Sequence, residues 1–340
     1  MKKKIIPFLA LAFLMPTFAG CSTAKVEYSD PSVDMSVRQI TAGENTPVTE
    51  MLDDARSAVV GVYVELNDGY AIGSGVAIRE GGYVLTNYHV VEDANALTLY
   101  YADKTTGSAS FVWGDAGLDL AIIKSSKNLP YLATTSVDNL LVGEDVYAIG
   151  TPLTLQFKHT VTKGIVSAKN RTLEVESNNG TSFLQSLVQH DASINAGNSG
   201  GALINSKGEV VGINTLKAIE GEGLGFAVPI DIGDAVMEQV SKDNSYSEPY
   251  LGVFGFDSDI AELYGQSVER AGVYVVSVDG PASKIGLKKG DVITEFNGEN
   301  IENILDLRIA LFSTENMQNV SLKFIRNGII NEKYVDLVTK

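Results

Sequence analysis

Short runs of β-favouring residues recur along the chain from residue 59 to residue 228, with glycine and polar turns between them. Regular short runs of this kind, without long helical periods, are typical of β-barrels and β-sandwiches. The pattern therefore predicts a mostly β region. Its clearest expected strands are Val59 to Leu66, Ala96 to Tyr101, Asp145 to Ile149, His159 to Lys169 and Val210 to Thr215.

The pattern changes after this region. A helical period over Ile230 to Lys242 is followed by a polar linker, residues 243–249. A second helix is expected over Leu305 to Phe312, with apolar residues at the i, i+4, i+7 positions that pack on a sheet. That face consists of Leu305, Ile309 and Phe312.

The first twenty residues read as an export signal. Three lysines, Lys2 to Lys4, precede an apolar run from Ile5 to Ala19, which is too short to span a bilayer comfortably. The segment Phe18-Ala-Gly-Cys21 resembles a bacterial lipobox, which implies cleavage before Cys21 and acylation of that residue. The alternative is an ordinary cleaved signal with an incidental cysteine. Cys21 is the only cysteine, so no internal disulfide can form.

The next segment, residues 21–50, is polar and contains Asp30-Pro31 and Asn45-Thr-Pro47 as breakers. It has little periodicity, so we interpret it as a tether. The expected domains are then a protease region at 51–242 and a C-terminal domain at 249–340.

Composition excludes one class of partner. The chain has 340 residues, 44% of them hydrophobic, which is ample for packed cores in two or three domains. Its net charge is −16, and phosphate binding needs clustered Lys and Arg. We therefore expect no nucleic-acid partner.

The candidate nucleophile is Ser199, in the stretch Asp191-Ala-Ser-Ile-Asn-Ala-Gly-Asn-Ser-Gly-Gly-Ala-Leu203. Gly197, Gly200 and Gly201 allow a tight turn in which backbone N–H groups face one point beside the serine oxygen. An acyl-transfer nucleophile needs such donors where negative charge develops. On its own, however, the stretch also fits a plain surface turn.

The chain has three histidines, so candidates for the base are few. His89 ends a β-rich run, whereas His159 lies in an alternating strand where an exposed imidazole is ordinary, and His190 belongs to the strand before Ser199. Asp119 stands directly before a buried apolar strand. The order His89, Asp119, Ser199 is that of chymotrypsin-type proteases, and the histidines are too scattered for a zinc site.

Three blocks resemble the signature blocks of the HtrA/Deg family, trypsin-like serine proteases with C-terminal PDZ domains. They are Thr86-Asn-Tyr-His-Val-Val91, Asp119-Leu-Ala-Ile-Ile123 and Asp191 to Gly201. Further blocks agree, and the resemblance runs from about Val59 to the end of the chain. These further blocks are Gly73 to Ile78, Thr160 to Ser167, Val211 to Thr215 and Gly223 to Pro229.

The resemblance implies a chymotrypsin-like pair of six-stranded β-barrels followed by a small α+β PDZ domain. His89 would act as general base, Asp119 would orient it, and Ser199 would attack the substrate carbonyl. The oxyanion hole would use backbone N–H groups of Gly197, Asn198 and Ser199. The pocket for the residue before the cut would involve Ile194 and Leu216, and no cofactor or metal is implied.

Tyr250-Leu251-Gly252-Val253 resembles the carboxylate-binding loop of a PDZ domain, and Pro281 to Ile293 is a more specific match. Such a domain binds the C-terminal end of a peptide as an added strand. The alternative is a small α+β domain without a ligand.

The leading hypothesis is an ATP-independent serine endopeptidase on the periplasmic side of the cell envelope, held by a lipid anchor. Its substrates would be unfolded or signalling proteins, and the family implies a homotrimer with PDZ-mediated peptide sensing. The rival hypothesis is a catalytically idle, chaperone-like peptide-binding protein. The complete set of His89, Asp119 and Ser199 favours the protease.

Overall fold

The structure is a computed structural model that describes residues 34–43, 45–151, 159–177, 180–195, 197–217, 223–243 and 246–340. The expected signal peptide and Cys21 lie outside the described residues. Residues 33–340 form one compact unit. In the described part, no helix has the length and apolar character needed to cross a bilayer.

The first β-barrel contains six strands and closes in the order β2-β3-β4-β7-β6-β5. Every neighbouring pair in it is antiparallel. The predicted strand Val59 to Leu66 is confirmed without a shift as β2. The others are β3 (Gly69–Arg79), β4 (Tyr83–Thr86), β5 (Ala96–Tyr100), β6 (Thr106–Asp115) and β7 (Leu120–Ser125).

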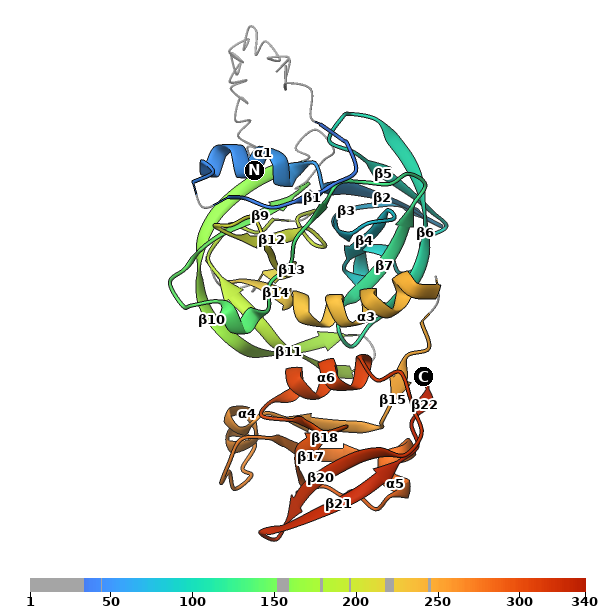
Figure 1. Ribbon diagram of the computed structural model, residues 1–340, viewed down its shortest axis with the longest axis vertical. Helices are drawn as coiled ribbons and strands as arrows, with labels where there is room; N and C mark the ends of the chain where they lie inside the picture. Colours follow the sequence, from blue (N-terminus) through green and yellow to red (C-terminus); the bar gives the residue numbers. More distant parts are fainter. Residues whose placement is uncertain are drawn as a thin grey trace, which may run out of the picture. The chain divides into compact units, whose positions relative to one another are not determined.

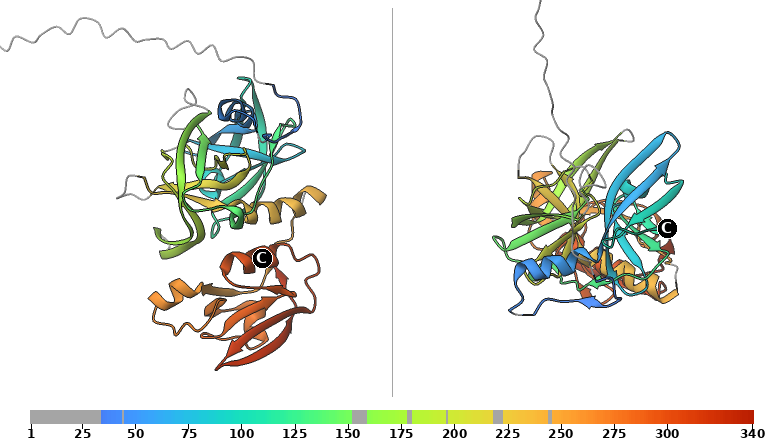
Figure 2. Two further views of the ribbon diagram at one scale, coloured as in Figure 1. Left: turned by 60° about the vertical axis from the view of Figure 1, so that its left-hand side comes forward. Right: turned by 90° about the horizontal axis from the view of Figure 1, so that it is seen from above.

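The second β-barrel also has six strands, in the order β10-β11-β14-β13-β12-β9, and lies beside the first (Figures 1 and 2). The predicted double barrel is therefore confirmed. Its strands are β9 (Asp145–Gly150), β10 (Thr160–Ser177), β11 (Gly180–His190), β12 (Ala202–Asn205), β13 (Val210–Lys217) and β14 (Gly225–Pro229). Strand β10 is longer than predicted because it pairs with β11 out to Ser177.

His159 differs from expectation. It precedes β10 with a φ of 59° and is only 5% exposed, so its imidazole is buried rather than on the surface. The strand alternation that predicted exposure begins one residue later, at Thr160.

The last part of the expected tether, residues 21–50, contains packed secondary structure. Strand β1 (Gln39–Ile40) pairs in parallel with β8 (Tyr131–Leu132), and Ile40 is 5% exposed in the main core. Helix α1 (Val48–Arg56) then buries Met51 and Ala55. Ile40, and a helix that begins at Val48, thus order residues that the polar composition assigned to the tether.

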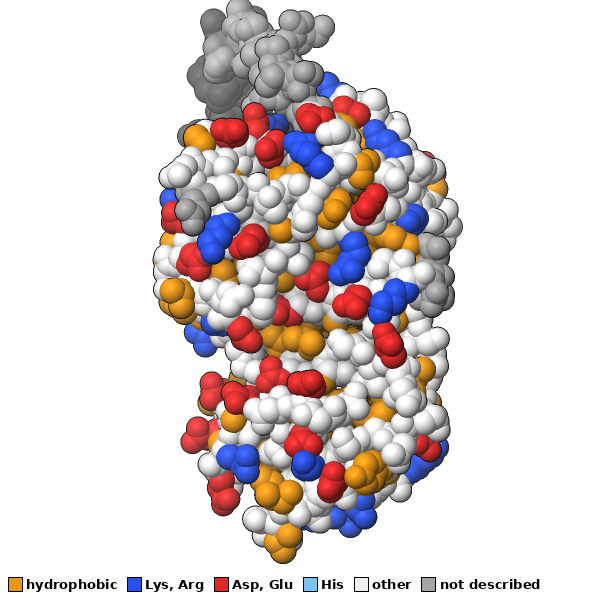
Figure 3. Space-filling view, viewed as in Figure 1, with side chains coloured by type: hydrophobic (Ala, Val, Ile, Leu, Met, Phe, Trp, Pro, Cys, Tyr) orange, Lys and Arg blue, Asp and Glu red, His pale blue; other side chains and the backbone are white. Residues whose placement is uncertain are grey.

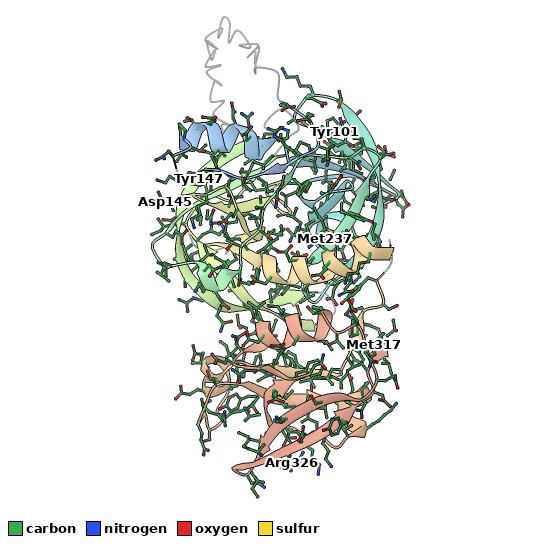
Figure 4. The ribbon with its side chains drawn as sticks, viewed as in Figure 1. Tyr101, Asp145, Tyr147, Met237, Met317 and Arg326 are labelled. Carbon is green, nitrogen blue, oxygen red and sulfur yellow. The ribbon has the colours of Figure 1, made fainter. Side chains whose placement is uncertain are left out.

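Three further helices complete the protease region. The helix predicted after the second barrel is confirmed as α3 (Ile230–Asp243), and Figure 4 marks Met237 on it, a fully buried residue of the main core. The other two are short: α2 (Tyr88–Val91) and the 3₁₀ helix η1 (Val137–Asn139).

The C-terminal domain is the predicted α+β unit. Strands β16-β17-β18-β20-β21 form one sheet, to which β19 adds, while β15 pairs with β22. The strands are β15 (Pro249–Tyr250), β16 (Val253–Phe256), β17 (Val273–Val278), β18 (Val292–Phe296), β19 (Glu299–Asn300), β20 (Val320–Arg326), β21 (Ile329–Val335) and β22 (Val338–Thr339). The helices are α4 (Ser258–Leu263), α5 (Gly280–Lys284) and α6 (Ile304–Phe312).

Helix α6 is apolar on two faces, and the prediction chose the wrong one for the sheet. Ile304 and Leu307 pack in the core of the C-terminal domain. The predicted face of Leu305, Ile309 and Phe312 instead joins the main core of the protease region. A periodicity identifies an apolar stripe but not the partner that covers it.

Charged side chains of both signs are interspersed over the face shown in Figure 3. At the end of β20, next to the hairpin tip, Arg326 is labelled in Figure 4. Its guanidinium donates to both carboxylate oxygens of the buried Asp291 at 2.6 Å, and this pair joins β20 to the start of β18.

Candidate active site

His89 lies on the short helix α2, which is separated from the end of strand β4 by a single residue, and Asp119 directly precedes strand β7. The imidazole Nδ1 lies 2.9 Å from each carboxylate oxygen of Asp119, and the His89 backbone N–H donates to the same carboxylate at 3.1 Å. A carboxylate only accepts, so Nδ1 must carry a proton, which leaves Nε2 as the lone-pair nitrogen. The His89 side chain is 42% exposed, whereas Asp119 is buried.

Asp119 is held from two further directions. The side-chain amide of Asn87 donates to its backbone carbonyl at 2.8 Å, and the hydroxyl of Thr215 donates to its carboxylate at 2.5 Å. Asp119 has a φ of 52°, a conformation that such contacts must maintain. These bonds fix the carboxylate that orients His89.

The pKa of His89 reflects this pairing. Burial opposes protonation, but the hydrogen bond and the negative charge of Asp119, with a smaller contribution from Glu92, raise the pKa above its ordinary value of 6.5. The imidazole can therefore hold a proton more firmly than a free histidine, as a base in acyl transfer must do.

Ser199 lies in the turn that connects β11 to β12. Its hydroxyl donates to the backbone carbonyl of Thr215 at 2.9 Å. Because the Thr215 side chain contacts Asp119, this residue links the serine to the histidine–aspartate pair. Thr215 was not singled out in the sequence, although it closes one of the quoted blocks, Val211 to Thr215.

The turn that carries Ser199 requires glycine. Gly200 has a φ of 83°, and an added Cβ would lie 2.1 Å from the backbone oxygen of Ser74 and 2.3 Å from the hydroxyl of Thr86. A Cβ at Gly201 would lie 2.2 Å from the backbone oxygen of Ile149. The first barrel therefore touches the backbone of this turn directly.

Ser74, on β3 of the first barrel, is a second residue that the sequence did not reveal. Its backbone N–H donates to the carbonyl of Ser199 at 2.8 Å, and its hydroxyl donates to the carbonyl of Gly197 at 2.7 Å. The same hydroxyl accepts from the N–H of Thr151 at 2.7 Å. Ser74 thus positions the turn of the other barrel from both ends.

The expected oxyanion donors separate into two groups. The Asn198 N–H donates to the carbonyl of Asn195 at 3.0 Å, so it is used inside the turn and was wrongly included. Within the described residues, the N–H groups of Gly197 and Ser199 have no backbone or side-chain acceptor. These two donors remain available to a substrate oxygen.

Of the two expected specificity residues, only Ile194 has a described side chain. It is 5% exposed and packs in the main core. Leu216 lies in β13, but its side chain falls outside the described residues.

The predicted carboxylate loop, Tyr250 to Val253, leads into β16. The carbonyls of Leu251 and Gly252 accept from the N–H groups of Ala282 and Asp279, at 2.8 and 2.9 Å. Gly252 has a φ of 82°, and a Cβ there would lie 2.5 Å from the backbone oxygen of Asp279. With its carbonyls turned toward α5, the loop has no described backbone acceptor for the N–H groups of Leu251 and Gly252.

A pocket of about 180 Å³ lies between this loop with β16 and helix α6. Protease residues also line it, among them Gln185 of β11. The Gln185 amide donates to the backbone oxygen of Gly255 at 3.0 Å and accepts from Arg308 of α6 at 3.0 Å. The groove is therefore bounded by both domains.

Comparisons with known proteins agree with this architecture. The Trypsin-like peptidase domain family matches residues 73–213, and the PDZ domain family matches residues 249–337. The chain is 35% identical over 340 residues to the serine protease Do-like HtrB of Bacillus subtilis (strain 168), covering 90% of this chain and 73% of that protein. It is 41% identical over 269 residues to the probable periplasmic serine endoprotease DegP-like of Pseudomonas putida (strain GB-1), covering 77% of this chain and 54% of that one.

Solved structures give the same result. The HtrA-type protease AlgW with a tripeptide superposes with a TM-score of 0.66 at 31% identity, covering 87% of this chain and 98% of that chain. The serine endoprotease from Yersinia pestis gives a TM-score of 0.60 at 30% identity, with 88% and 100% covered. The chain belongs to the HtrA/DegP family of trypsin-like serine proteases with a PDZ domain.

Proposed function

We propose that this serine endopeptidase cleaves unfolded or signalling proteins of the cell envelope through an acyl-enzyme formed on Ser199. The observation that carries the proposal is the His89 imidazole, held in its Nδ1–H form by the buried Asp119, with Thr215 joining that pair to Ser199. This arrangement leaves the His89 Nε2 lone pair for the serine proton.

In the first half of the reaction, the Ser199 hydroxyl turns from the Thr215 carbonyl toward His89 Nε2. As Oγ bonds to the scissile carbonyl carbon, its proton passes to Nε2, and Asp119 stabilises the imidazolium. The carbonyl oxygen becomes an oxyanion that accepts from the N–H groups of Gly197 and Ser199. Such donors are typically worth about 3–4 kcal/mol each in the transition state.

In the second half, the C–N bond breaks and Nε2 returns the proton to the leaving amine. Water then attacks the acyl-enzyme with His89 again as base, which releases the acid product and restores Ser199. Ser74 and Thr215 act as positioning residues. Ser74 holds the turn that carries Ser199, and Thr215 holds the carboxylate of Asp119.

The PDZ domain is proposed to sense C-terminal peptides. A peptide would add a strand beside β16, and its carboxylate would accept from the N–H groups at Leu251, Gly252 and Val253. Peptides with apolar ends fit the groove, where Leu307 and Leu311 of α6 line the wall. Such a peptide raises activity only by its preference for the active arrangement, so activation should saturate.

We propose that the enzyme works on the periplasmic side of the envelope, which is where the name of the Pseudomonas relative puts that protein. Residues 1–20 would be the signal peptide and Cys21 the lipidated residue, with a shorter tether than residues 21–50 because β1 and α1 are packed. The working form would be a homotrimer. Mass spectrometry of the mature N-terminus tests the anchor: an unmodified first residue other than Cys21 would contradict it.

The catalytic assignment is tested with casein and a fluorophosphonate probe. Ser199→Ala should abolish both cleavage and labelling, whereas Ser193→Ala, a matched change at an exposed position of the same segment, should keep both. Casein cleavage by Ser199→Ala at the wild-type rate would refute the assignment and favour a different active centre.

The sensing role is tested in the full-length chain with a series of C-terminal peptides and a reporter substrate. Gly252→Ala should remove activation, because the new Cβ meets the Asp279 backbone. Gly265→Ala is the matched control: its φ is also positive, 76°, but no atom lies within 4 Å of the added Cβ. Equal activation of both variants would leave the PDZ domain only a tethering role.

A further inference from the structure

A second hollow adjoins the catalytic histidine. It encloses about 800 Å³ between the β2–β3 turn, centred on Asn67 and Asp68, and the segment from His89 to Asn95. All of its lining residues belong to the first barrel or its connections. His89 itself forms part of the wall, so this hollow adjoins the proposed catalytic base.

Its position assigns it to one side of the scissile bond. The acyl half of the substrate stays on Ser199, which the second barrel carries beside Thr215 of β13. The amine half receives its proton from His89 and leaves past it. A hollow walled by the first barrel beyond His89 therefore faces the residues that follow the scissile bond.

The lining of this hollow has one sign of charge. Asp68, Glu92 and Asp93 line it, and no Lys or Arg does. Among the residues that the structure describes, none of these three carboxylates forms an ion pair. Leu66 and Ala71 supply apolar surface to its lining.

The wall is held by hydrogen bonds rather than formed by free loops. The Asn95 side-chain amide donates to Asn67 Oδ1 at 3.0 Å, and the Asn95 N–H donates to the carbonyl of Glu65 at 2.8 Å. These bonds clamp the two lining segments together. The negative charge of Glu92 is the smallest of the causes that raise the pKa of His89, so this carboxylate of the wall lies near the proposed base.

We infer that this acidic hollow is a specificity pocket for the leaving-group half of the substrate and that it selects lysine or arginine just after the scissile bond. The apolar lining residues fit the aliphatic stem of such a side chain, and the carboxylates would attract its cationic end. The inference rests on the proposed function, because it assumes that Ser199 and His89 cleave the substrate.

The test uses quenched fluorescent peptides with valine before the bond and Lys, Gln or Glu at one of the following positions. Wild-type enzyme should cleave the best Lys peptide roughly fivefold faster than its Gln partner in kcat/KM, the ratio that about 1 kcal/mol from an exposed charge pair produces. The Glu peptide should be slower than the Gln peptide. Raising the ionic strength should shrink both differences, because salt screens exposed charges.

The combined variant Asp68→Asn, Glu92→Gln, Asp93→Asn should bring the Lys-to-Gln ratio close to one. Asn tolerates the φ of 57° at position 93, and the ratio within one enzyme cancels any effect of Glu92 on His89 itself. Glu80→Gln, which removes an exposed acid outside the hollow, should keep the wild-type ratio.

A wild-type ratio near one at every position would overturn the inference, and so would a preference for Lys that survives in the combined variant. Neither result would touch the catalytic assignment, because the Gln peptides would still be cleaved. Failure of the wild-type enzyme to cleave any peptide or to react with a fluorophosphonate would instead overturn the proposed function and the inference with it.

Discussion

His190 should make the protease domain acid-sensitive. The imidazole is fully buried at the end of β11, and neither ring nitrogen has a hydrogen-bond partner of good geometry among the described residues. Burial lowers its pKa to about 4; the charge of Asp191 and the nearby polar groups of Ala192 and Asn214 offset this only in part. The ring is therefore neutral in the folded protein at pH 7.

The size of this loss of stability follows from the difference between the pKa of His190 in the folded and in the unfolded state. The unfolded chain binds the proton near pH 6.5, whereas the folded chain binds it near pH 4, so protonation favours unfolding. At 1.36 kcal/mol per pH unit, this difference corresponds to roughly 3 kcal/mol. The contribution of the neutral His190 to the free energy of unfolding is fully present above pH 6.5. It is lost as the pH drops toward 4 and changes no further below that.

The perturbation is His190→Leu, made in the Ser199→Ala background to prevent self-cleavage. Urea unfolding between pH 7 and pH 4 can be followed by the fluorescence of Trp113, the only tryptophan, which lies in the core shared by both barrels. Near pH 7 the variant should be within about 1 kcal/mol of its parent, because an apolar side chain replaces an unpartnered polar ring. Near pH 4 it should be more stable by roughly 3 kcal/mol.

Other acidic groups also titrate in this range, but they do so in both proteins and cancel in the difference. His190→Gln serves as a second variant, because it too cannot be protonated. Parallel stability curves for the parent and both variants would refute the reasoning. They would mean that the buried ring takes up its proton without cost, for example through a partner that forms on protonation.

Three further predictions follow from the site and the C-terminal domain. On the acid side, the pH profile of kcat/KM should have an apparent pKa above 6.5, with activity lost as the pH falls. Asp119→Asn should lower that pKa and should also lower the rate by about 10⁴-fold. Gly200→Ala should cost at least about 10²-fold in kcat by displacing the serine turn, whereas Gly143→Ala, with φ 90° and open space around it, should not. Asp291→Asn should destabilise the PDZ domain by about 2 kcal/mol in thermal unfolding, because the partly exposed Arg326 loses charge-assisted hydrogen bonds to a buried carboxylate; an unchanged melting temperature would contradict this.

The sequence predicted what depends on local pattern. β2 was placed to the residue because its run of β-favouring residues stops at the turn residues Asn67 and Asp68. The His89, Asp119 and Ser199 assignments depended on short blocks whose residue types have a chemical reason to occur together. The structure brings these three into one cluster, although the residues are up to 110 positions apart in the chain.

What the sequence did not predict are contacts between residues whose own surroundings look ordinary. Ser74 reaches Gly197 over 123 positions, and Thr215 reaches Asp119 over 96. A serine or threonine in a strand gives no local sign that its hydroxyl crosses to another barrel. The same limit applies to helix α6, where only the tertiary partner decides which of two apolar faces packs on the sheet.

These cross-barrel contacts determine how the active site can fail. The first barrel contributes His89, Asp119 and Ser74, and the second contributes Ser199 and Thr215. Each hydrogen bond between the two sets is worth only about 0.5–1.5 kcal/mol, so neither barrel is held together by them. They are directional, however, and a shift of the barrels by about 1 Å would misalign several at once. A substitution anywhere in the shared core that moves one barrel against the other can therefore abolish catalysis by Ser199 without unfolding either barrel.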